Sequence, residues 1–306
     1  MADAFHAAHP DITIDIQLTP NADYWQYGMP KDFDTVGLWY NKKLFDAAGV
    51  KYPDATWTWQ NVIDAVQKLT DPGKGVWGIA SPDWTQENLF NTILQAGGSI
   101  IGADKKKSGF DDPKTLAGLQ YALDFVTKYK VSPTAQQMTD TQPDQLFASG
   151  KAAMFADGDY DLPEYKAAGL DADVAPLPAG PDGKHATVIN GLANVVYAKT
   201  KHPAAAWEWV EYLGSKEANE IQAKTGTVIP AYNGLSADWV ASAPQYHLQT
   251  FIDQLDVAVP YPVSKNTAAW TKPMQDTLDQ IWGGKLDVQT GAKQIADQMN
   301  AALAKE

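Results

Sequence analysis

Two short patterns in the sequence bring together residue types that do chemistry in other proteins. Residues 73–78, GKGVWG, match the dinucleotide pattern G-x-G-x-x-G letter for letter. That pattern works only after a strand and before a helix, whose N-terminus faces the pyrophosphate. Here a predicted helix precedes it and a predicted strand at 76–80 follows, so the order is reversed. The sequence does not predict a nucleotide cofactor.

Acidic and histidine residues also show partial metal-site spacing. Asp157, Asp159 and Asp161 are spaced like the first three ligands of a calcium loop. The sixth and twelfth positions of that loop would be Leu and Ala instead of Gly and Glu, so calcium is not expected. His6 and His9 share a helical face, but a metal site needs at least one further ligand and none is evident nearby. We therefore expect no metal and no cofactor.

The composition excludes several function classes. Lys and Arg total 24 against 37 Asp and Glu, a net charge of −13 that repels nucleic-acid phosphates and anionic membrane surfaces. The chain contains no Arg, the usual fork for carboxylate and phosphate, and no Cys, so thiolate chemistry is absent. The common hydrolase and Walker motifs are also missing. A neutral ligand fits best, and nucleic acid is not an expected partner.

The aromatic residues favour carbohydrate as that ligand. The chain has 11 Trp, and aromatic residues make up 11% of it. Trp and Tyr rings stack on the apolar faces of sugars while polar neighbours bond the hydroxyl groups. Many of these rings are expected to be ordinary core residues. A glycoside hydrolase stays open as an alternative, because such enzymes combine aromatic clefts with two carboxylates, although nothing here singles out a pair.

The elements that must position these residues alternate along the chain. A length of 306 residues suggests two domains. Predicted strands at 12–18, 35–40, 76–80 and 152–156 alternate with predicted helices at 42–48, 58–69, 86–96 and 113–129. This alternation favours an α/β architecture with largely parallel sheets, and helices dominate beyond residue 203.

Residues 27–49, YGMPKDFDTVGLWYNKKLFDAAG, closely resemble the segment that enters the second lobe of the extracellular sugar-binding proteins of ABC importers. These are the family 1, maltose-binding-protein-like solute-binding proteins. The resemblance continues in family order through residues 56–59 (TWTW), 147–158 (FASGKAAMFADG), 190–193 (NGLA) and 225–231 (TGTVIPA). It covers most of the chain from Tyr27 to the C-terminus.

The resemblance implies a two-lobe, periplasmic-binding-protein-like (type II) fold with a sugar in the inter-lobe cleft. Closure of the lobes would be presented to ABC permease subunits in the membrane, and the bound mono- or oligosaccharide would not be chemically changed. The implied first lobe is residues 1–35 plus 190–256, and the second is 36–189 plus 257–306. Because family members carry several dozen more residues between Trp25 and Tyr27, we expect an incomplete first lobe. A non-binding truncated remnant is therefore a further alternative.

The family resemblance also implies a cellular location. Full-length relatives are periplasmic, or extracellular and lipid-anchored, and begin with a signal peptide. The sequence as written opens on MADAF, with neither a basic start nor an apolar signal core. As written, the chain is expected in the cytoplasm.

Position in the family motifs assigns the first three ligand-binding residues. Asp34 falls where the family has an acidic residue that binds sugar hydroxyl groups, and a pairing with Lys31 is its alternative role. Tyr160 falls where an aromatic ring, more often Trp, stacks on sugar. Trp270 matches a second stacking ring near the start of a late helix. For both rings the alternative role is helix packing.

Four further residues complete the expected site. Asn190 and Gly191 fall at a lobe crossing, where a residue without a side chain lets backbone approach a ligand. Trp84 and Glu87 fall in a region that often faces the cleft, and a surface position is their alternative. Trp57 and Trp59, by contrast, are expected to be structural because they frame a helix start.

Overall fold

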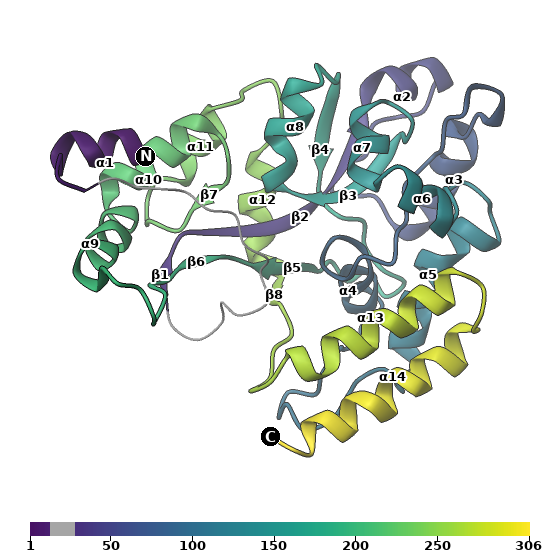
Figure 1. Ribbon diagram of the computed structural model, residues 1–306. Helices are drawn as coiled ribbons and strands as arrows, with labels where there is room; N and C mark the ends of the chain where they lie inside the picture. Colours follow the sequence, from purple (N-terminus) through teal and green to yellow (C-terminus); the bar gives the residue numbers. More distant parts are fainter. Residues whose placement is uncertain (13–27) are drawn as a thin grey trace. The chain divides into compact units, whose positions relative to one another are not determined.

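The computed structural model describes residues 1–12 and 28–306, which form two compact units (Figure 1). The first unit contains Met1–Asp34 and Asn190–Pro244, and the second contains Thr35–Ile189 and Gln245–Glu306. Apart from Ile12, the strand expected at 12–18 lies outside the described residues. Among the described residues, no helix is long and apolar enough to cross a bilayer.

The expected end of the first lobe at residue 256 is wrong, because residues 245–256 belong to the second unit. Gln254 is buried there; its amide donates to the carbonyl of Val36 at 2.8 Å and accepts from the backbone N–H of Leu177 at 3.1 Å. The Thr35 hydroxyl donates to the carbonyl of Phe251 at 2.8 Å. These buried hydrogen bonds attach residues 245–256 to the second unit. Sequence composition alone does not reveal such long-range contacts.

The first unit is mainly helical. Phe5 is fully buried, stacks on His9 at 4.4 Å and meets the rings of Trp209 and Tyr212 at 4.9 and 5.2 Å. This aromatic cluster joins the first helix to a later one. The elements of this unit, besides the start of β2, are α1 (Ala2–Ala8), β1 (Met29–Pro30), β6 (Ala193–Asn194), α9 (Pro203–Leu213), α10 (Lys216–Thr225), β7 (Ile229–Pro230) and α11 (Ser236–Ala241).

The sheet of the second unit is mixed. Strand β2 (Asp32–Asn41) pairs antiparallel with β3 (Met154–Gly158) and β4 (Ala172–Ala175), whereas β5 (Thr187–Asn190) pairs parallel with β8 (Ala258–Pro260). The expectation of largely parallel sheets is therefore wrong for β2. The expectation of parallel pairing assumes that one crossover connection, usually a single helix, links neighbouring strands. Along the chain, however, several helices lie between β2 and β3 (Figure 1). The strand expected at 76–80 forms only isolated bridges.

Local signals place the helices of the second unit. Gly49 adopts a φ of 63°, which ends α2 in the left-handed region, and Thr58 with Asn61 forms a capping box at the start of α3. The helices are α2 (Lys42–Ala48), α3 (Trp59–Leu69), α4 (Phe90–Gln95), α5 (Pro113–Thr127), α6 (Ala135–Asp140), α7 (Pro143–Ala148), α8 (Leu162–Ala167), α12 (Gln249–Asp253), α13 (Ala268–Trp282) and α14 (Val288–Leu303).

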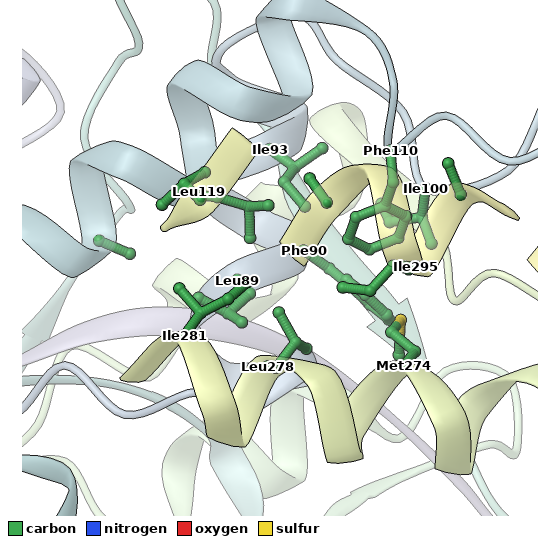
Figure 2. Packing of buried hydrophobic residues seen from close by; sticks show 14 of the residues in the cluster. Leu89, Phe90, Ile93, Ile100, Phe110, Leu119, Met274, Leu278, Ile281 and Ile295 are labelled. Atoms are coloured by element: carbon green, nitrogen blue, oxygen red, sulfur yellow. The ribbon is translucent and has the colours of Figure 1, made fainter. Parts of the chain in front are cut away.

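The main core of the second unit lies where α4, α5, α13 and α14 meet (Figure 2). Phe90 and Ile93 of α4 belong to one cluster with Leu278 and Ile281 of α13, and all four are at most 1% exposed. A Cβ atom at Gly291 of α14 would lie 2.5 Å from Ile281, so the glycine allows the two helices to approach. This apolar burial supplies the main stabilisation of the unit and anchors the segment just before α4.

Candidate ligand-binding site

A π-helical turn positions two of the predicted site residues. Trp84 caps the turn Thr85–Leu89, and the backbone N–H of Leu89 donates to the Trp84 carbonyl at 3.0 Å. Phe90 then begins α4, and Leu89 points into the core (Figure 2). Single π-helical turns occur mostly inside α-helices and are frequent at functional sites. Here the wider turn leaves Trp84 and Glu87 partly exposed at the end of a firmly buried helix.

Tyr160 reaches this turn from a distant part of the chain. It lies in the 3-10 helix Asp159–Asp161 that follows β3, and its hydroxyl donates to Oε1 of Glu87 at 2.6 Å. A Cβ atom at Gly158 would lie 2.2 Å from the Tyr160 ring. The ring therefore lies against the Gly158 backbone, and only glycine permits that approach. Tyr160 remains partly exposed.

Tyr261 adds a third partly exposed ring, which the sequence did not single out. Its backbone N–H donates to the carbonyl of Ile189 at 2.9 Å, and its hydroxyl lies 3.5 Å from that of Thr85. Trp84 packs edge-on against the buried ring of Phe155, with centroids 6.0 Å apart. In the sequence, Tyr261 lies between two prolines. This pattern favours an extended backbone but does not by itself indicate a binding residue.

The electrostatics around Glu87 are those of a carboxyl group in a poorly hydrated setting. Burial raises the pKa of Glu87, and the hydrogen bond from Tyr160 opposes that rise. Glu87 in turn raises the pKa of Tyr261, after the larger effect of burial. A partly desolvated carboxyl among aromatic rings can bond hydroxyl groups of a neutral ligand through either of its protonation states.

The three-aspartate pattern is not a calcium site in this fold. Asp157 and Asp159 are fully buried, and Asp157 accepts a hydrogen bond from the hydroxyl of Tyr165. Burial raises the pKa of Asp157 well above its ordinary value, and the hydrogen-bonded Asp161 raises it further. Within residues 1–12 and 28–306, no group of three or more His, Asp or Glu side chains is placed to hold a metal ion.

Other sequence signals have structural roles. His6 bonds the carbonyl of Ile12 at 2.9 Å, and His9 pairs with Glu208 at 2.8 Å. Trp59 stacks on Tyr121 with 3.8 Å between centroids. The prediction that Trp59 is structural agrees with this packing.

Trp270 packs in the core of the second unit, contrary to its predicted role as a ring that stacks on sugar. The residue is 1% exposed and belongs to the core where α13 packs. Its indole N–H donates to the hydroxyl of Ser264 at 2.9 Å. From the sequence, a large aromatic ring near the start of a helix is compatible with either core packing or stacking on a ligand. The burial of Trp270 indicates core packing. We leave Trp270 out of the candidate site.

The remaining predicted residues lie in the first unit. Asp34 is buried in β2 at 9% exposure, and Asn190 ends β5 with a half-buried side chain. A Cβ atom at Gly191 would lie 2.4 Å from the carbonyl oxygen of Asp32, so a glycine is required there by close backbone approach. Lys31 pairs with Asp32 at 2.5 Å. The second unit thus brings Trp84, Glu87 and Tyr160 together, whereas Asp34, Asn190 and Gly191 belong to the other unit.

Comparison with known proteins agrees with this architecture. Residues 8–220 match the family described as bacterial extracellular solute-binding protein. An ABC substrate-binding protein from Listeria monocytogenes, in complex with cycloalternan, superposes with a TM-score of 0.84 and 27% identity, covering 91% of this chain and 72% of that one. A solute-binding protein from Thermotoga lettingae bound to α-D-tagatose gives a TM-score of 0.79 and 26% identity, with the same coverage.

Curated relatives extend the comparison to sequence. A maltotriose-binding protein of Pyrococcus abyssi is 30% identical over 192 residues, 61% of this chain and 40% of the relative. A maltodextrin-binding protein of Bacillus subtilis is 27% identical over 293 residues, 87% of this chain and 64% of the relative. The chain thus spans less than two thirds of the length of either relative.

Proposed function

Because the chain belongs to the family of bacterial extracellular solute-binding proteins, we propose that it is the carbohydrate-binding component of an ABC sugar importer and catalyses no reaction. The observation that carries this proposal is the meeting of Trp84, Glu87 and Tyr160, two partly exposed rings beside a hydrogen-bonded carboxyl group. Rings of this kind stack on sugar faces, and the carboxyl bonds hydroxyl groups. Its partners are then a neutral mono- or oligosaccharide and the permease subunits of the importer.

The absence of Arg favours an uncharged ligand, and the names of the relatives suggest which sugar to test first. The chain offers no guanidinium to bind a carboxylate or phosphate. Two relatives are named as maltotriose-binding and maltodextrin-binding proteins. Maltotriose is therefore the first probe. In the first unit, Asp34 stays a proposed hydroxyl-binding residue, with Asn190 and Gly191 as proposed backbone contacts.

The glycoside hydrolase alternative is less well supported by the residues that the structure describes. A hydrolase needs two carboxyl groups open to the substrate, one acting as acid and the other as base or nucleophile. Asp157, a nearby carboxyl group whose pKa is raised well above its ordinary value, is fully buried and is closed to a substrate. We infer that a bound sugar leaves the protein unchanged.

Calorimetric titration with maltotriose tests the proposal. Wild-type protein is expected to give a saturable binding isotherm, and Tyr160→Ala to give weaker binding with an unchanged circular dichroism spectrum. The matched control is Tyr197→Ala, a change at a 69% exposed tyrosine of the first unit. A screen of maltose, tagatose, xylobiose and cellobiose by thermal shift identifies other sugars. Absence of any shift would support the non-binding remnant.

A further inference from the structure

A buried asparagine at the start of α4 bonds the π-helical turn that precedes it. Asn91 is 1% exposed, and its side-chain amide donates to the carbonyl oxygens of Gln86 at 2.7 Å and Glu87 at 3.0 Å. Backbone carbonyl groups that are withdrawn from water need hydrogen-bond donors. The amide of Asn91 supplies them at the residue that carries the carboxyl group of the proposed sugar site.

The same side chain attaches the turn to strand β5. The backbone N–H of Val188 donates to Oδ1 of Asn91 at 2.8 Å, in a buried contact between residues 97 positions apart in the sequence. Strand β5 is itself held by its parallel pairing with β8. An asparagine side chain carries both a donor NH₂ group and an acceptor oxygen. Here the NH₂ group bonds the turn and the oxygen bonds the strand.

A second buried amide of α4 provides a comparison within the same helix. Gln95 is 2% exposed, donates to the carbonyl of Ala186 at 3.3 Å and accepts from the indole N–H of Trp59 at 2.8 Å. Residues four apart lie on one face of a helix, so Asn91 and Gln95 both reach the segment that contains Ala186 and Val188. The two amides share burial and this contact, and they differ in the bonds that Asn91 makes to the turn.

We propose that Asn91 is a positioning residue for sugar binding, whose amide holds the turn bearing Trp84 and Glu87 against β5. The inference rests on the proposed function for its consequence in binding. Without the amide, the carbonyl groups of Gln86 and Glu87 lose these donors, and the turn opens toward water to regain hydrogen bonds. Trp84 and Glu87 are then no longer pre-organised, so sugar binding must supply the free energy that orders them.

Hydrogen exchange without any sugar tests the attachment of the turn. Asn91→Leu removes one buried amide, and Gln95→Met, the matched control, removes the other. Protection of the backbone N–H groups at 85–90, relative to that of α13, is measured by mass spectrometry. It is expected to fall at least about tenfold in Asn91→Leu and to stay within about threefold of wild type in Gln95→Met. Equal loss of protection in the two variants would overturn the inference.

A second pair of variants is used if Asn91→Leu fails to fold. Asn91→Asp keeps the shape of the side chain and the acceptor oxygen for Val188, and it replaces the NH₂ group that bonds the turn by an oxygen. Gln95→Glu makes the same change at the control position. The loss of protection at 85–90 should again be confined to the Asn91 variant, and protection that is equal in the two variants contradicts the proposal.

Maltotriose affinity then tests the consequence for binding. Asn91→Leu is expected to bind maltotriose at least about fivefold more weakly than wild type, and Gln95→Met to bind it as tightly as wild type. In a Glu87→Ala background, the carboxyl group that Asn91 positions is absent. There, Asn91→Leu should weaken binding by a factor at least about twofold smaller than in wild type. A purely structural role of Asn91 would lower stability without this coupling to Glu87.

The outcomes of these measurements are separable. Affinity losses that multiply independently in the double variant, or wild-type affinity in Asn91→Leu, would overturn the positioning role in binding. No maltotriose binding by wild-type protein counts against the proposed function with this sugar, and hydrogen exchange still decides whether Asn91 holds the turn.

Discussion

The hydroxyl of Tyr160 donates a 2.6 Å hydrogen bond to Glu87, a residue 73 positions away in the sequence. This contact joins the end of β3 to the π-helical turn before α4. It sets the plane of one partly exposed ring beside a partly desolvated carboxyl group. The two residues form the central feature of the proposed site because their hydrogen bond brings an aromatic ring and a carboxyl group together from distant parts of the chain.

Two substitutions at Tyr160 distinguish the contribution of its hydroxyl group to sugar affinity from the contribution of its ring. Tyr160→Phe removes the hydrogen bond but keeps the stacking surface, so maltotriose affinity should fall by about 0.5 to 1.5 kcal/mol. Tyr160→Ala removes the ring as well and should lose about 1 kcal/mol more, an additional loss of about fivefold. Titration calorimetry measures both. Equal affinities in the two variants would mean that the ring does not contact the sugar.

Gly158 is expected to tolerate no side chain. A Cβ atom there would lie 2.2 Å from the Tyr160 ring, so Gly158→Ala must displace the ring and should lower both the melting temperature and sugar affinity. Gly73→Ala is the control, because its nearest contact would be 3.3 Å from a flexible carboxylate. A Gly158→Ala variant with wild-type affinity would contradict the described placement of the ring.

The core role of Trp270 is tested by stability and binding together. Trp270→Ala removes a side chain that is 1% exposed and should cost about 3 to 5 kcal/mol of unfolding free energy. Trp270→Phe keeps most of the packing and should leave maltotriose affinity unchanged. Denaturant unfolding and calorimetry measure the two effects. A folded Trp270→Phe variant with lost affinity would restore the predicted stacking role.

Asp157 should make stability fall as the pH rises. Its folded pKa is raised, by burial first and then by Asp161, so the folded state holds a proton that the unfolded chain releases near pH 4. The stabilising contribution is therefore complete below pH 4 and decreases at higher pH. Asp157→Asn should flatten the profile of melting temperature between pH 4 and 8, whereas Asp276→Asn should not. If the melting temperatures of wild type and Asp157→Asn change with pH in the same way, the pH dependence of stability does not come from Asp157.

Local sequence signals predicted many helices and strands but not which strands pair with one another. The helix that ends at Gly49 and the helix that begins after Thr58 follow from caps within a few residues, and both are confirmed. The antiparallel pairing of β2 depends on residues more than a hundred positions away, which periodicity does not encode. The π-helical turn was missed because the apolar residues at 89, 90, 93 and 94 have the spacing of a regular helix.

The candidate site was predicted unevenly for the same reason. The family resemblance placed Tyr160 at a motif position and Trp84 and Glu87 in a region that often faces the cleft, and the fold joins Tyr160 to Glu87. Trp270 was assigned by position alone, and position does not determine whether a ring is exposed. Tyr261 was not predicted, since its contact with Thr85 forms only in the folded chain.

Sugar binding without catalysis is tested by titrating maltotriose into wild-type protein and into Trp84→Ala, with reducing sugar assayed in the same samples. Trp207→Ala, at a 52% exposed tryptophan of α9, is the control. We expect saturable binding by wild type and by the control, at least about fivefold weaker binding by Trp84→Ala, and no release of sugar. Equal affinity in all three proteins, or steady protein-dependent release of glucose, would contradict it.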